Sequence, residues 1–123
     1  MDERTVRLSV PAEASFARTV RMMAANLAVV CDMSVDEVED VRMAAEEGFV
    51  LCCATAPDSC EVTFSLAAGE VRTSFDLGPE TRSNDSDLDL AELLLDAVCD
   101  EHGVSEDGAQ LYLVNRAGAA HGA

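Results

Sequence analysis

The sequence predicts an α+β domain in which helices cover one face of a mostly antiparallel sheet, in two layers. Short stretches of alternating apolar and polar residues are typical of strands, and longer stretches with an apolar residue every three or four positions are typical of helices. These stretches follow one another without an internal repeat or a linker. The expected order is strand, helix, helix, strand, strand, helix, strand.

The amino-terminal part contains the first strand and two helices. Residues 5–10 alternate in polarity and are followed by a proline, which ends a strand. Apolar residues then recur at steps of four and three over residues 16–30, which indicates one helix with an apolar stripe. Ser34 and Glu37 have the spacing of a capping box, so a second helix is expected to begin there and to end before Pro57. Its inward face is expected to consist of Val38, Val41, Ala45, Gly48 and Cys52.

The carboxyl-terminal part contains a hairpin, a helix and a last strand. Residues 62–66 and 71–75 alternate in polarity and are joined by AAGE, where Gly69 suits a hairpin turn. The polar stretch GPETRSNDSD predicts a loop, after which a third helix is expected from about Leu88 to Cys99. The last strand is expected over residues 110–114. The apolar residues of the third helix are Leu90, Leu93, Leu94, Ala97 and Val98.

Length and composition favour one globular domain. A chain of 123 residues can bury a single modest core. Hydrophobic residues make up 49% and charged residues 26%, which is a globular mixture. We expect the domain over residues 1–117 and a flexible tail over residues 118–123, where small residues dominate.

The charge excludes several classes of ligand. The chain has 24 acidic side chains against 8 basic ones, all arginine, and a net charge of -16. Nucleic acids and anionic membranes need clustered cations, so neither is expected as a partner. The absence of lysine also excludes a Walker-type phosphate loop.

The five cysteines include no CxxC pair, and the amino terminus MDERTVRL has no apolar signal core. No stretch approaches the roughly 18 consecutive apolar residues of a membrane span. We therefore expect the protein in the reducing cytoplasm. Adjacent Cys52 and Cys53 could form a thiol or metal site, but free cysteines are commonly buried as small apolar residues, which is the favoured interpretation.

Few residues suggest chemistry by themselves. Glu46 and Glu47 lie about 100° apart on the second helix, so only one can approach its inward edge and serve as a general base. The commoner alternative is two solvated glutamates. Asp76, in SFDLGPE, could accept a hydrogen bond from an exocyclic amine such as that of adenine, or be an ordinary turn residue. His102 and His121 lack metal-ligand spacing, so no metal site is expected.

The run ASFARTVRMMAANLAVVCDMSVDEVEDVRMAAEEGF resembles the anti-sigma-factor serine kinases of bacterial stress and sporulation regulation, which belong to the GHKL (Bergerat-fold, histidine-kinase-like) ATPase superfamily. The resemblance extends over nearly the whole chain. It continues in D-L-G after the hairpin, in LLLDAV of the third helix and in the closing strand GAQLYLV. It implies the Bergerat fold and a site for ATP and magnesium.

In this family the second helix carries a glutamate that acts as base, which Glu47 matches. An asparagine four residues later holds magnesium, and here that position is Leu51. Leucine offers no oxygen to a hard cation. The resemblance also gives Asp76 and Gly78 an adenine-binding role. The segment that matches the ATP lid has acidic residues where the family has glycines, and these would repel phosphate. They are Glu80, Asp85, Asp87 and Asp89, opposed by Arg82 alone.

The sequence therefore favours a degenerate member, a pseudokinase that binds another protein and in which binding of ATP and magnesium is weak or absent. ATP and magnesium are expected as cofactors only if the site is functional. The resemblance implies a sigma factor or an anti-anti-sigma (STAS-type) protein as partner, with Arg18 on the contact surface, and a homodimer. A solvent-facing arginine with no such role is an equal alternative for Arg18. The competing function is an active protein serine kinase with Glu47 as base and another metal ligand in place of the asparagine.

Overall fold

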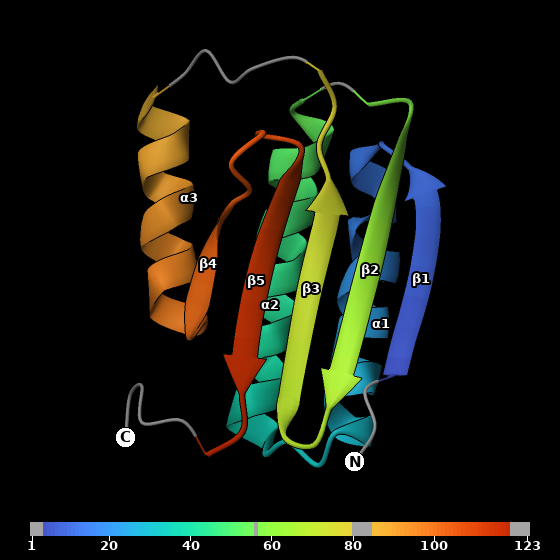
Figure 1. Ribbon diagram of the computed structural model, residues 1–123, viewed down its shortest axis with the longest axis vertical. Coiled ribbons are helices and arrows are strands. Elements are labelled where there is room, and N and C mark those ends of the chain that lie inside the picture. Colours follow the sequence, from blue (N-terminus) through green and yellow to red (C-terminus); the bar gives the residue numbers. More distant parts are fainter. Residues whose placement is uncertain (1–3, 56, 80–84, 119–123) are drawn as a thin grey trace.

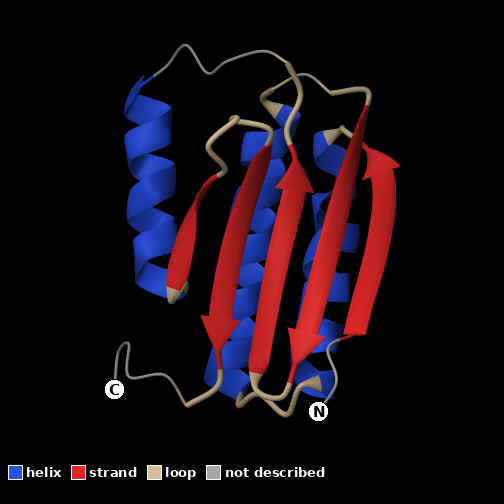
Figure 2. Cartoon of the chain, in the orientation of Figure 1, coloured by secondary structure: helices blue, strands red, loops and turns tan. Residues whose placement is uncertain are grey.

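The structure is a computed structural model that describes residues 4–55, 57–79 and 85–118. Its sheet has five strands in the order β1-β2-β3-β5-β4, and all neighbouring strands are antiparallel. Figures 1 and 2 show the sheet in front of the helices of residues 17–30 and 35–53, with the helix of residues 85–98 beside the edge strand β4. The elements are β1 (Arg4–Pro11), the 3₁₀ helix η1 (Ala14–Phe16), α1 (Ala17–Val30), α2 (Val35–Cys53), β2 (Ser59–Ala67), β3 (Glu70–Asp76), α3 (Asp85–Val98), β4 (Glu101–Val104) and β5 (Gln110–Arg116).

The hairpin and the capping box are confirmed. Gly69 has a φ of +70° in the turn between β2 and β3, a conformation that glycine adopts without steric cost. Ser34 Oγ accepts a hydrogen bond from the Glu37 N–H at 3.2 Å, and the Glu37 carboxylate accepts one from the Ser34 N–H at 2.8 Å. These bonds satisfy two backbone donors that the first turn of α2 would otherwise leave unpaired.

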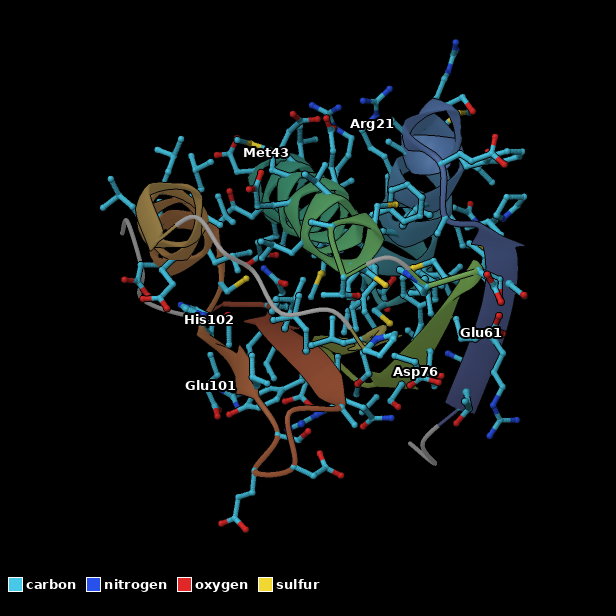
Figure 3. All side chains as sticks on the ribbon, turned by 90° about the horizontal axis from the view of Figure 1, so that it is seen from above. Arg21, Met43, Glu61, Asp76, Glu101 and His102 are labelled. Atoms are coloured by element: carbon cyan, nitrogen blue, oxygen red, sulfur yellow. The ribbon has the colours of Figure 1, made fainter. Side chains whose placement is uncertain are left out.

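The core lies between the sheet and the helices, and Figure 3 shows all three helices on the same side of the sheet. Phe49 of α2, Phe64 of β2 and Phe75 of β3 are each fully buried. Gly48 lets α2 approach β3, because a Cβ atom at this position would lie 2.4 Å from Cε2 of Phe75. The relative position of α2 and β3, which carry Glu47 and Asp76, thus depends on this glycine.

The expected order of elements is wrong in one respect, because it omits β4. This strand has the sequence EHGV and pairs with β5, with His102 opposite Leu113. Four residues with one large aliphatic side chain give no readable alternation, so the strand depends on the edge that β5 offers. The predicted loop is also too long, since α3 begins at Asp85 and not near Leu88.

The sequence also predicts a carboxyl-terminal tail and no membrane-spanning segment. Residues 119–123 of the predicted tail lie outside the described residues. Within the part of the chain that the structure describes, none of the helices combines the length and the apolar character needed to cross a membrane.

Candidate functional site

Glu46 and Glu47 differ in their surroundings, as expected from their 100° separation on α2. The Glu46 carboxylate accepts a hydrogen bond from the Arg21 guanidinium of α1 at 2.9 Å. Glu47 is half-buried, and none of the described residues donates a hydrogen bond to its carboxylate or forms an ion pair with it. Burial, followed by the negative charge of Glu46, raises the pKa of the Glu47 carboxyl above its usual value. Glu47 is thus the carboxylate of the two that is available to a ligand.

The Glu47 side chain lines a pocket of about 150 Å³ between α2 and α3. Sites for drug-sized ligands are larger, with volumes of roughly 300–1,000 Å³. Figure 3 shows Met43 on the side of the helix layer that faces away from the sheet. The pocket therefore opens on the helical surface of the molecule. Its lining residues are Met43, Glu46, Glu47, Leu94 and Val98.

Leu51 lies one helical turn after Glu47, at the position where the resemblance implies a metal-binding asparagine. Its side chain is half-buried and packs against the hydrophobic core. It does not line the pocket that contains Glu47. An aliphatic side chain supplies packing here and no oxygen ligand.

Asp76 ends β3 and is exposed. Its carboxylate accepts a hydrogen bond from Nε2 of Gln110, on the neighbouring strand β5, at 2.9 Å. It lines a second, open pocket of about 560 Å³ at this end of the sheet, together with residues of the turn before β5. The lining residues are Asp76, Leu77, Ser105, Asp107, Ala109 and Gln110.

Gly78 holds the segment after β3 against the end of α2. Its N–H donates to Oγ1 of Thr55 at 2.5 Å, and the same hydroxyl donates to the carbonyl of Cys52 at 2.7 Å. A Cβ atom on Gly78 would lie 2.4 Å from the carbonyl oxygen of Thr55 and 2.7 Å from the nitrogen of Pro57. The glycine is therefore required by a close approach of two backbone segments.

Cys52 and Cys60 form a contact that the sequence analysis missed. Both are fully buried, and their Sγ atoms lie 3.1 Å apart. The Cys52 thiol also lies 3.1 Å from the carbonyl oxygen of Asp76. The hydrogen bond to Cys52 and burial raise the pKa of the Cys60 thiol. No pattern in the sequence indicates this contact, because it joins the end of α2 to the start of β2.

Glu47 and Asp76 line different pockets among the described residues. The first belongs to the α2–α3 pocket and the second to the pocket at the end of the sheet. Figure 3 shows Asp76 close to the sheet, away from Met43. Arg18 is exposed at the start of α1, the helix that also supplies Arg21 to Glu46.

Other candidate residues have structural partners or lie outside the description. His102 pairs with Asp96 of α3 at 2.5 Å. Among residues 4–55, 57–79 and 85–118, no group of three or more histidine, cysteine, aspartate or glutamate side chains is arranged to hold a metal ion. Of the lid residues, Glu80 and Arg82 lie outside the described part. Only the backbone of Asp85, Asp87 and Asp89 is described.

Comparisons with known proteins identify a shared fold. No model of a known protein family matches the sequence. The curated proteins contain no match either. The crystal structure of the RsbU and RsbW domains of Rv1364c from Mycobacterium tuberculosis matches with a TM-score of 0.65 and 20% identity, over 93% of this chain and 32% of that chain. The two share a fold. This chain spans about a third of the length of the matched one, and at this identity the likeness concerns the fold alone.

Proposed function

We propose that this protein is a regulatory protein of the anti-sigma type that acts by binding another protein, either a sigma factor or a STAS-type anti-anti-sigma protein. The shared fold supports this, because the matched structure contains an RsbW domain and RsbW is an anti-sigma-factor serine kinase of the GHKL superfamily. The proposal includes the two-layer Bergerat arrangement, a homodimer and a location in the cytoplasm.

The proposal that the protein is not an active kinase rests on the packing of Leu51. A magnesium site needs oxygen ligands, and the side chain one turn beyond Glu47 is aliphatic and packed against the core. These residues do not fit a magnesium-bound nucleotide, so we assign no step to ATP.

Isothermal titration calorimetry with ATP and magnesium tests this part. We expect no heat of binding at ATP concentrations up to the millimolar range. The matched control is Leu51→Asn, which restores the amide oxygen that the resemblance implies. A micromolar dissociation constant for the unaltered protein would contradict the proposal.

Partner binding is tested by pull-down from the native cell with unaltered protein and with Arg18→Glu. Arg18 is exposed and has no ion pair with any described residue, so its substitution should leave the fold intact. We expect a sigma factor or a STAS-type protein to be recovered by the unaltered protein and lost with Arg18→Glu. Equal recovery would remove Arg18 from the proposal, and recovery of neither class of protein would contradict the function itself.

A second candidate function is an active protein serine kinase, and the surroundings of Glu47 favour it. A half-buried carboxylate whose pKa is raised above its usual value is suited to act as a general base. Transfer of radiolabel from ATP to a STAS-type protein, abolished by Glu47→Gln, would establish this activity. The pseudokinase proposal expects no transfer by either protein.

A further inference from the structure

The helix α3 exposes large aliphatic side chains on one face. Leu90, Leu93 and Leu94 are 58%, 66% and 40% exposed, whereas Ala91 and Leu95 of the same helix are buried. The exposed leucines follow the spacing i, i+3 and i+4, so they form one stripe along the helix. Three leucines on one exposed stripe are typical of an interaction surface and not of a solvated helix face.

The facing side of α2 continues this surface. Met43 is 46% exposed and contributes to the α2–α3 pocket together with Leu94 and Val98. Val50, two helical turns after Met43, is 51% exposed. We call the region formed by Met43, Val50, Leu90, Leu93, Leu94 and Val98, with Glu46 and Glu47 among the residues that line its pocket, the α2–α3 groove. Figure 1 shows that its two walls run in opposite directions.

The pocket in the groove carries negative charge. Glu46 forms an ion pair with Arg21, but Glu47 has no ion pair or hydrogen bond with any described residue. A half-buried carboxylate without a partner is stabilised by a cation that enters the pocket. The net charge of -16 also favours approach of a basic segment and opposes an acidic one.

We propose that the α2–α3 groove binds an amphipathic helix of a partner protein that presents aliphatic side chains on one face and a lysine or arginine to Glu47. Two antiparallel helical walls with side chains repeated at each turn match the i, i+3, i+4 and i+7 anchors of a third helix. The pocket of about 150 Å³ suits the insertion of a side chain and not of a larger ligand. Met43 adds a flexible side chain that adapts to the bound helix.

This inference rests on the proposed function, because it names the segment of the partner that the regulatory protein would recognise. The two are separable. The inference that the groove binds the partner is refuted if variants of the groove recover the sigma factor or STAS-type protein as well as the unaltered protein does. The proposed anti-sigma function is refuted if neither class of protein is recovered, even if the groove binds helical peptides.

The direct test is selection from a phage-displayed library of helical peptides of about 16 residues, which is roughly four turns. Selected peptides are then synthesised with a fluorescent label and measured by anisotropy. We expect enriched sequences with aliphatic residues at i, i+3 or i+4, and i+7, and with a central lysine or arginine. Dissociation constants on the order of micromolar are expected, rising with salt concentration.

Protein variants assign the binding to the groove. The double variant Leu93→Ser with Leu94→Ser should weaken binding at least about tenfold. Glu47→Gln should remove the preference for a peptide with arginine over the same peptide with glutamine. The matched control is Met22→Ser, which changes a residue of α1 that is 57% exposed and should leave binding unchanged.

Three results would overturn the inference. The first is a library that yields no enriched peptide, and the second is binding that the double leucine variant does not weaken. The third is a dimer in sedimentation that the same double variant dissociates, because the groove would then be occupied by a second copy of this chain. Circular dichroism of each variant establishes that the fold is retained.

Discussion

Replacing Gly48 with alanine tests whether close packing of α2 on β3 positions the two halves of the candidate site. The added methyl group would lie 2.4 Å from Cε2 and 2.9 Å from Cζ of Phe75, and 3.1 Å from Cδ1 of Leu113. Carbon atoms in favourable contact are about 3.5–4.0 Å apart. The side chains of Phe75 and Leu113 are both fully buried, so neither can move without displacing other core residues.

Two opposing effects determine the size of the change. Alanine stabilises a helix interior relative to glycine by about 1 kcal/mol. Overpacking a core costs about 1–3 kcal/mol, and the upper end applies where the overlap exceeds about 1 Å against a ring that cannot move. We therefore expect Gly48→Ala to lower the free energy of unfolding by about 2 kcal/mol, which for a domain of this size lowers Tm by roughly 8 °C.

The assay is urea denaturation followed by far-ultraviolet circular dichroism, since the chain has no tryptophan and one tyrosine for fluorescence. The control is the same substitution in a Phe75→Leu background, because leucine has no atoms at the ε and ζ positions. There Gly48→Ala should be neutral or slightly stabilising, which corresponds to a coupling energy of about 2 kcal/mol. An equal loss in both backgrounds would refute the argument that the contact with Phe75 makes glycine necessary.

Further predictions concern titration, cysteine reactivity and two local backbone contacts. Because burial raises the pKa of Glu47 above 4.5 in the folded state, its ionised form destabilises the fold at neutral pH and this cost disappears as the pH falls toward 4.5. Glu47→Gln should therefore raise the urea midpoint at pH 7 and not at pH 4, and the opposite pH dependence would contradict this. Iodoacetamide should modify Cys53 alone in the native protein, as seen by mass spectrometry, because the other four cysteines are buried. This reaction should require alkaline pH, since burial raises the pKa of the Cys53 thiol. Ser34→Ala should cost about 1 kcal/mol in urea denaturation through loss of the capping box, and a change near zero would argue against that bond. Gly78→Ala should destabilise by about 2 kcal/mol, because its Cβ meets the backbone of Thr55, and a neutral result would refute the close approach.

Several features were predictable because they depend on residues close together in the sequence. The capping box at Ser34 and the hairpin turn at Gly69 are local, and both are confirmed. Periodicity correctly indicated α1, α2 and the strands of the hairpin, since one apolar face must be buried in each. The position of Leu51 on α2, one turn beyond Glu47, followed from the same periodicity.

Contacts between distant segments were not predictable from the sequence. The strand β4 forms because β5 offers an unpaired edge, although EHGV has little alternation of its own. The surroundings of Glu47 and of Asp76 depend on how α3 and the turn before β5 pack. The contact between Cys52 and Cys60 depends on where β2 begins relative to the end of α2.

The sequence by itself determined the helices and all strands except β4, the acidic charge of the chain and the aliphatic residue at position 51. Only the tertiary structure decided which apolar side chains are covered. The leucines of α3 have the pattern of a buried stripe, yet Leu90, Leu93 and Leu94 remain exposed while Ala91 and Leu95 face the core. Periodicity shows that one face of a helix is apolar, but whether another element covers that face depends on packing between segments far apart in the chain.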